Sequence, residues 1–156
     1  GRALSEPIAD SGRSVAEDAL AVMTEGTQGY PFLIQLVGSS CWRVSPGDSE
    51  ISLGDAEHGV RAARLRLGSL VYEPALAAAS DIDKSYLLEM SRDDGPSRTS
   101  DIQKRLNVDK GYANVYRSRL IEADLIEAPR RGYVDFTLPY LRDYLREHAA
   151  TLVRDV

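Results

Sequence analysis

The stretch Thr99–Leu138, TSDIQKRLNVDKGYANVYRSRLIEADLIEAPRRGYVDFTL, decides the predicted fold. Its apolar residues four apart predict a short amphipathic helix over Thr99–Leu106. The tight turn NVDKG follows, and Asp109 in that turn is a typical N-cap residue. A second helix is therefore expected over Lys110–Ala123.

The end of this stretch has the periodicity of a strand. Apolar and more polar residues alternate over Tyr133–Leu138, and Pro129–Gly132 supplies a hairpin turn before them. A helix over Ile82–Arg92 precedes the stretch, and Pro139 is expected to begin a last helix. The order helix, helix, tight turn, helix, two-stranded ribbon, helix is that of a winged helix-turn-helix, which we predict for residues 81–156.

The first half of the chain, residues 1–80, has few strand formers and is predicted to be helical throughout. A helical stripe over Val15–Glu25 is expected to stop at Gly26. A helix over Pro31–Arg43 begins with a first-turn proline and is apolar nearly all round, so we expect it to be buried on most sides. The sequence SLGD, Ser52–Asp55, resembles a capping box that begins a further helix. The predicted fold is therefore mainly α, with a helical domain before the winged helix.

Composition excludes several classes of protein. The chain has 156 residues, 43% of them hydrophobic and 28% charged, with a net charge of −5, so no global attraction to nucleic acid or an anionic membrane is expected. The longest apolar run, Tyr30–Val37, is too short to span a bilayer. A single cysteine, Cys41, excludes an intrachain disulfide and favours a reducing, cytoplasmic compartment. The opening residues suggest a piece of a longer protein.

Catalytic and metal-binding motifs are not found in the sequence. There is no phosphate-loop pattern and no glycine-rich dinucleotide fingerprint. Glu57-His58 lacks the second histidine of a zinc-binding helix, and His148 stands alone. Cys41 has no nearby base in the sequence and is interpreted as a buried structural thiol. We therefore expect no catalytic residue, no metal site and no enzyme activity in this chain alone.

The segment EGTQGYPFLIQLVGSSCWR, Glu25–Arg43, resembles the lid helix of AAA+/STAND P-loop ATPases, and similar lids in prokaryotic relatives of the origin-recognition ATPases. The order of a helical lid and then a winged helix is also that of the family, so the resemblance covers most of the chain. It implies that the lid closes over ATP or ADP held by an upstream α/β core. Gly29, Tyr30 and Pro31 would then lie near the nucleotide, and the chain by itself is expected to bind none.

One feature departs from that family. Many of its lids carry an early arginine that senses the γ-phosphate, whereas the first arginine of this helix is Arg43, about three turns along. The resemblance therefore implies a lid that grips the base. The alternative is that Gly29, Tyr30 and Pro31 merely end one helix and begin the next.

The second helix of the predicted helix-turn-helix and the hairpin tip supply candidate partner-binding residues. These are Lys110, Asn114, Arg117, Ser118, Arg130 and Arg131. Against DNA binding, the residues from Asp81 onward include 13 Lys and Arg but 14 Asp and Glu. Ile121, near the exposed side, favours a protein partner slightly. The partner is therefore predicted to be either a protein or double-stranded DNA.

Two functions remain from the sequence. The first is a non-catalytic regulatory piece of an AAA+/STAND ATPase, whose lid covers the nucleotide and whose winged helix relays its state to a partner. The second is a winged-helix DNA-binding transcriptional regulator whose helical first half serves oligomerisation. No membrane partner is expected in either case.

Overall fold

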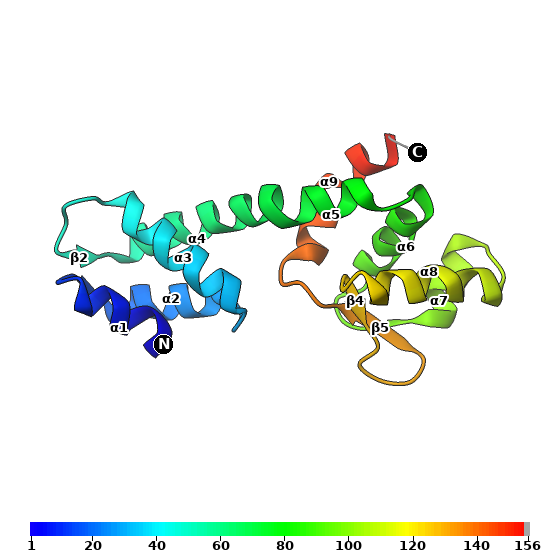
Figure 1. Ribbon diagram of the computed structural model, residues 1–156, viewed down its shortest axis with the longest axis horizontal. Coiled ribbons are helices and arrows are strands. Elements are labelled where there is room, and N and C mark those ends of the chain that lie inside the picture. The colour runs from blue at the N-terminus through cyan, green and yellow to red at the C-terminus, as the bar shows by residue number, and fades with distance from the viewer. Residues whose placement is uncertain (155–156) are drawn as a thin grey trace. The chain divides into compact units, whose positions relative to one another are not determined.

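The computed structural model describes residues 1–154, and the chain divides into two compact units, Gly1–Val71 and Tyr72–Val156 (Figure 1). The architecture is mainly helical, as the sequence predicts, and it also contains small sheets. The sequence places the division of the chain between residues 80 and 81, whereas the first structural unit ends at Val71 and the second begins at Tyr72. Tyr72 is 1% exposed, and its ring packs on Tyr144 of the second unit at a centroid distance of 5.1 Å.

The first unit contains helices and one small parallel sheet, which the sequence did not predict. Its elements are α1 (Arg2–Asp10), β1 (Ser14–Val15), α2 (Glu17–Thr27), α3 (Pro31–Val44), β2 (Glu50–Ile51) and α4 (Leu53–Leu67), followed by a π-helical turn over Gly68–Tyr72. Strands β1 and β2 pair with Ser14 opposite Glu50 and Val15 opposite Ile51. Two residues per strand are too few to leave a periodic signal, which explains why sequence patterning missed them.

Helix α2 does not stop at Gly26, so that prediction is wrong. It continues to Thr27, and the chain turns through Gln28 and Gly29, which have φ values of 46° and 71°. Gly26 is buried because it packs on Val60 of α4: a Cβ at Gly26 would lie 2.8 Å from Val60 Cγ2. This glycine therefore permits a close approach of two helices and does not end the helix.

Helix α3 begins at Pro31 as predicted, but it is not buried on most sides. It buries one face, which consists of Leu33, Leu36, Val37, Ser40 and Cys41. Phe32 and Trp42 are 43% and 38% exposed. An apolar helix of a small unit has only as many buried faces as it has neighbours, and α3 packs mainly on α2 and α4.

The second unit contains the remaining helices and an antiparallel sheet. Its elements are α5 (Glu73–Ala78), α6 (Asp81–Ser91), β3 (Ser97–Arg98), α7 (Thr99–Leu106), α8 (Lys110–Glu122), β4 (Ile126–Glu127), β5 (Tyr133–Phe136) and α9 (Leu141–Arg154). The strand order is β3-β5-β4, so β3 adds a third strand to the predicted hairpin. Helix α9 begins two residues after Pro139, because Tyr140 adopts a left-handed backbone with φ 63°.

Local side-chain chemistry fixes the turns around α8. The Asp109 carboxylate accepts a hydrogen bond from the backbone N–H of Tyr112 at 2.9 Å, which confirms the predicted N-cap. Asn107 before it and Asp124 after the helix have φ values of 54° and 57°, the left-handed region that Asn and Asp tolerate. Val134 of β5, Ile102 of α7 and Leu120 of α8 are all buried in this unit. Local turn chemistry thus defines both ends of α8.

Within residues 1–154, no helix is both long and apolar enough to cross a membrane.

Candidate functional site

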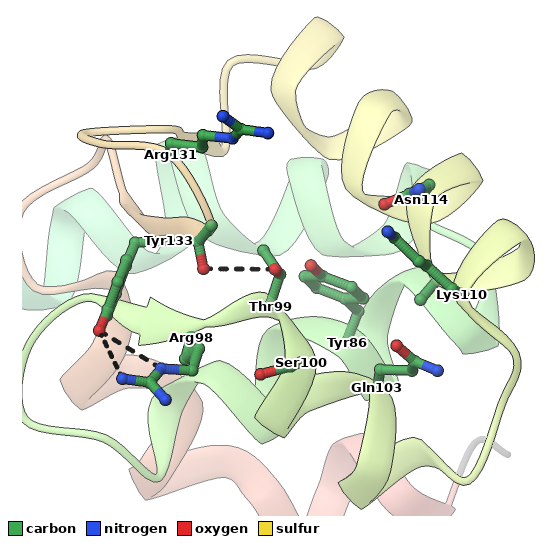
Figure 2. Close-up of a pocket in the computed structure, with 11 residues that line it drawn as sticks. Tyr86, Arg98, Thr99, Ser100, Gln103, Lys110, Asn114, Arg131 and Tyr133 are labelled. Carbon is green, nitrogen blue, oxygen red and sulfur yellow. Dashed lines mark hydrogen bonds between the residues drawn. The ribbon is translucent and has the colours of Figure 1, made fainter.

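A groove of about 470 Å³ lies where α7, α8 and the tip of the β4–β5 hairpin meet in the second unit (Figure 2). The charged side chains that line it are Arg98, Lys110 and Arg131. All three are basic, although the residues from 81 onward carry slightly more acidic than basic side chains. The fold therefore collects positive charge at one place on a unit that is not basic as a whole.

One wall of the groove is helix α8. The Asp109 cap sets where the helix begins, so that Lys110 is its first residue. Asn114 lies one turn further along, and residues four apart share a helix face. Figure 2 shows both side chains extending from α8 beside the groove. The helix thus contributes an ammonium group and an amide to the same wall.

The opposite wall is the hairpin, which is tied to the start of α7. Both the backbone N–H and the hydroxyl of Thr99 donate to the Gly132 carbonyl, at 2.9 and 3.2 Å. Gly132 has φ 78°, a conformation that the hairpin tip requires and that glycine adopts without strain. This link fixes the position of the neighbouring Arg131 relative to α7.

Strand pairing places Tyr133 and two arginines, Arg98 and Arg130, beside the groove. Arg98 of β3 lies directly opposite Tyr133 of β5, and its guanidinium donates to the Tyr133 hydroxyl at 3.1 Å (Figure 2). The guanidinium of Arg130 lies 3.8 Å from the centre of the same ring. The hydrogen bond from Arg98 and the two positive charges lower the pKa of the Tyr133 phenol. Two guanidinium groups, from Arg98 and Arg130, therefore contact Tyr133 beside the groove.

The floor of the groove is Tyr86 of α6, whose side chain is 1% exposed. Burial raises the pKa of this phenol to about 12, with a smaller opposing effect from the charge of Arg117. At neutral pH Tyr86 therefore presents a neutral hydroxyl that can donate a hydrogen bond.

The six predicted partner-binding residues are only partly brought together. Lys110, Asn114 and Arg131 line the groove, and Arg130 packs on Tyr133, which also lines it. Arg117 and Ser118 do not line the groove. Arg117 is half-buried, and its Nε is buried without a hydrogen-bond partner among the described residues, whereas Ser118 is exposed further along α8.

Sequence reasoning missed two thirds of the polar residues that line the groove. The additional residues with polar side chains are Tyr86, Arg98, Thr99, Ser100, Gln103 and Tyr133. Thr99 and Ser100 stand at the first turn of a short predicted helix, which is a signal for an exposed helix N-terminus. The other four are brought to the groove by strand pairing and helix packing, which leave no pattern in sequence.

The predicted nucleotide-binding tripeptide forms the turn between α2 and α3. Gly29 has φ 71°, and the backbone N–H of Tyr30 donates to the Thr27 carbonyl at 2.9 Å. Tyr30 is the N-cap of α3 but makes no side-chain capping hydrogen bond, and the first turn carries no acidic residue. The positive end of α3 is therefore not neutralised locally, and Pro31 is exposed there.

A second, more apolar groove of about 700 Å³ lies between α1 and α3. Pro31, Ile34 and Trp42 line it from α3, and Leu4 and Ile8 line it from α1. Gly29 and Tyr30 are not part of it.

The two histidines and the cysteine lie in ordinary local surroundings. Nδ1 of His58 lies 2.8 Å from the Gly54 carbonyl, and Nδ1 of His148 lies 2.8 Å from the Tyr144 carbonyl. Among the described residues, no three His, Cys, Asp or Glu side chains gather in a way that could hold a metal ion. Cys41 is fully buried, and burial raises its pKa to about 11, consistent with a structural thiol.

Comparison with known proteins gives one match. Residues 69–145 match a family described as a domain of unknown function (DUF8462). The match begins in the turn before α5 and ends inside α9, so it includes every element that forms the groove. No curated protein and no solved structure matches the chain.

Proposed function

We propose that this chain is the C-terminal regulatory region of a cytoplasmic AAA+/STAND-type P-loop ATPase. In this proposal the first domain is a lid over ATP or ADP bound by an upstream core, and the second is a winged helix that relays the nucleotide state to a partner. The chain supplies no catalytic residue. The observation that carries the proposal is the exposed start of α3, reached through Gly29, Tyr30 and Pro31.

The geometry of this turn supports a nucleotide-facing role. The peptide N–H groups of a first helical turn have no acceptor within the helix, and together with the helix dipole they favour negative charge. Here neither a side-chain cap nor an acidic first-turn residue satisfies them. Tyr30 is half-buried and Pro31 is exposed, so a flat base could pack on their rings.

The element order of the second unit supports the winged-helix assignment. Helices α6, α7 and α8 are followed by the β4–β5 hairpin and α9, and β3 pairs with β5. The tight turn at Asn107 and the Asp109 cap separate α7 from α8. In this reading α8 is the recognition helix and the hairpin is the wing.

The test is nucleotide affinity of the natural full-length protein, measured with a fluorescent ADP. Tyr30→Ala should weaken binding about tenfold, because base–aromatic stacking is lost. Trp42→Ala is the matched control, since Trp42 is an exposed aromatic residue of the same helix, roughly 16 Å from its start. A full-length protein that binds no nucleotide, or equal affinity in the two variants, overturns the proposal.

The second candidate function is binding of double-stranded DNA by the winged helix. The observation that favours it is the groove in which Arg98, Lys110 and Arg131 are the charged lining residues. Contacts to phosphates release counterions, so the affinity for a duplex should fall steeply with salt concentration. Binding that does not depend on salt concentration would favour the protein-partner alternative.

A further inference from the structure

Tyr86 is an unusual residue for the floor of a basic groove. The residue is 1% exposed, and the hydrogen bonds described within residues 1–154 include none to its hydroxyl, although this oxygen is not one of the fully enclosed atoms that lack a partner. Figure 2 shows the phenol reaching into the groove between Thr99 and Lys110. The hydroxyl oxygen therefore keeps access to the groove that Tyr86 lines, and it is a donor that a ligand in the groove can use.

Three kinds of group around this hydroxyl favour an anion. Lys110 and Arg131 line the groove and supply positive charge. Ser100 offers a hydroxyl. The Thr99 N–H donates to the Gly132 carbonyl, whereas the N–H groups that follow it in the first turn of α7 have no side-chain cap. These features belong to three elements, α7, α8 and the hairpin, and they converge on one space.

The acidic residues nearby do not occupy that space. Asp109 lies at the start of α8, but its carboxylate accepts the cap hydrogen bond from Tyr112. Asp101 lies in the first turn of α7, where its charge raises the pKa of Arg98 and of Arg105. Neither aspartate lines the groove.

We propose that the Tyr86 hydroxyl donates a hydrogen bond to a backbone phosphate of double-stranded DNA seated in this groove. Lys110 and Arg131 neutralise the phosphate, and the polar surface of α8 beside it, with Asn114 and Ser118, faces the base edges. Repeating phosphates fit a groove whose charged lining is entirely basic better than a mixed protein surface does. This inference rests on the DNA-binding candidate function and names the contact that anchors it.

The experiment compares Tyr86→Phe with the wild-type chain on a labelled 20-base-pair duplex. A hydrogen bond to a charged group is lost, so affinity should fall about tenfold. The slope of log affinity against log salt should stay unchanged, because a neutral hydroxyl releases no counterion. The melting temperature should not fall, because the hydroxyl makes no hydrogen bond within the protein.

Two variants serve as matched controls. The Tyr72 hydroxyl donates to the Pro139 carbonyl, so Tyr72→Phe should lower the melting temperature and leave DNA affinity unchanged. Arg131→Gln should reduce the salt slope by about one, as expected for a single phosphate contact. This pair separates a loss of folding from a loss of ligand contact, even if Tyr86→Phe proves less stable than expected.

Each outcome decides the proposal. Unchanged duplex affinity in Tyr86→Phe overturns the phosphate contact and leaves DNA binding standing. A wild-type chain that binds no duplex at low salt overturns both the contact and the DNA-binding candidate function. Binding of inorganic phosphate or of an acidic peptide such as poly-glutamate, without binding of the duplex, assigns the groove to another ligand and also overturns it. None of these results bears on nucleotide binding by the lid.

Discussion

Gly59 of α4 lies directly against the backbone of Cys41 in α3. A Cβ at Gly59 would come within 2.7 Å of both the Cα and the N of Cys41, and within 2.3 Å of its sulfur. Gly26 of α2 makes a similar approach to Val60 of α4. Helices α2 and α3 therefore each pack against α4 at a glycine, Gly26 and Gly59 respectively. The helices can approach this closely because neither glycine has a side chain.

Gly59→Ala should destabilise the first unit strongly. Backbone atoms of α3 cannot move aside as a flexible side chain can, so the helices must separate, at a cost of about 1–3 kcal/mol in the free energy of unfolding. The control is Gly54→Ala, whose nearest atom would be the Ser52 hydroxyl oxygen at 3.9 Å. That change should stabilise the helix by about 0.5–1 kcal/mol. Urea denaturation measures both, and equal stability of the two variants would contradict the crossing geometry.

Cys41 should be almost inert in the folded protein. Its side chain is fully buried, and its pKa of about 11 leaves little thiolate at pH 8, the form that attacks thiol reagents. Labelling with a disulfide reagent should therefore be slow in buffer and fast in urea. Gly59→Ala should accelerate labelling in buffer, because it opens the contact on the sulfur. Rapid labelling of the wild-type chain without denaturant would show that the thiol is accessible.

Asp55 should make the first unit sensitive to acid. Hydrogen bonds from Ser45 and then Ser52 lower its pKa to about 2 in the folded state. The pKa of an aspartate in an unfolded chain is about 3.9. The stabilisation is therefore complete above that pH and is lost as the pH falls toward 2. Asp55→Asn should reduce the slope of unfolding free energy against pH in this window.

A further variant tests the cause of that shift. Ser45→Ala removes the largest contribution, so the acid transition should move to higher pH without disappearing. If Asp55→Asn kept the full acid dependence between pH 4 and pH 2, other carboxylates would be responsible for it.

Asp83 should be one of the most sensitive charged residues of the second unit. It is 4% exposed and accepts hydrogen bonds from the Ser80 backbone and hydroxyl and from Arg119, at 2.9 Å for the last. Arg119→Ala leaves this carboxylate without its ion partner. Breaking a fully buried pair costs about 3 kcal/mol. Because the Arg119 side chain is exposed, the loss of stability here should be smaller than that.

The control for this pair is Arg92→Ala, which breaks an exposed pair with Glu89 at 2.9 Å. Exposed pairs contribute about 0.2–1 kcal/mol, so thermal unfolding should change little. A larger effect of Arg92→Ala than of Arg119→Ala would show that burial does not decide the strength of these pairs.

The sequence predicted the features that depend on a few neighbouring residues. Pro31 begins α3, the Ser52 and Asp55 capping box begins α4, and Asp109 caps α8. The hairpin over Pro129–Gly132 also follows from its own turn chemistry. These predictions hold because a cap or turn is a local hydrogen-bonding arrangement that the residue types nearly fix.

Only the tertiary structure decided where these elements meet. From the sequence, Gly26 is expected to end a helix. Its real role, a contact with Val60 of α4, joins residues far apart in the chain and so leaves no local signal. The sequence likewise contains no sign that Tyr86 of α6 would form the floor beneath Lys110 and Arg131, or that Arg98 would pair with Tyr133. Periodicity and capping report on the nearest turns of the chain, whereas helix crossing and strand register depend on packing between distant segments, and the basic groove exists only through that packing.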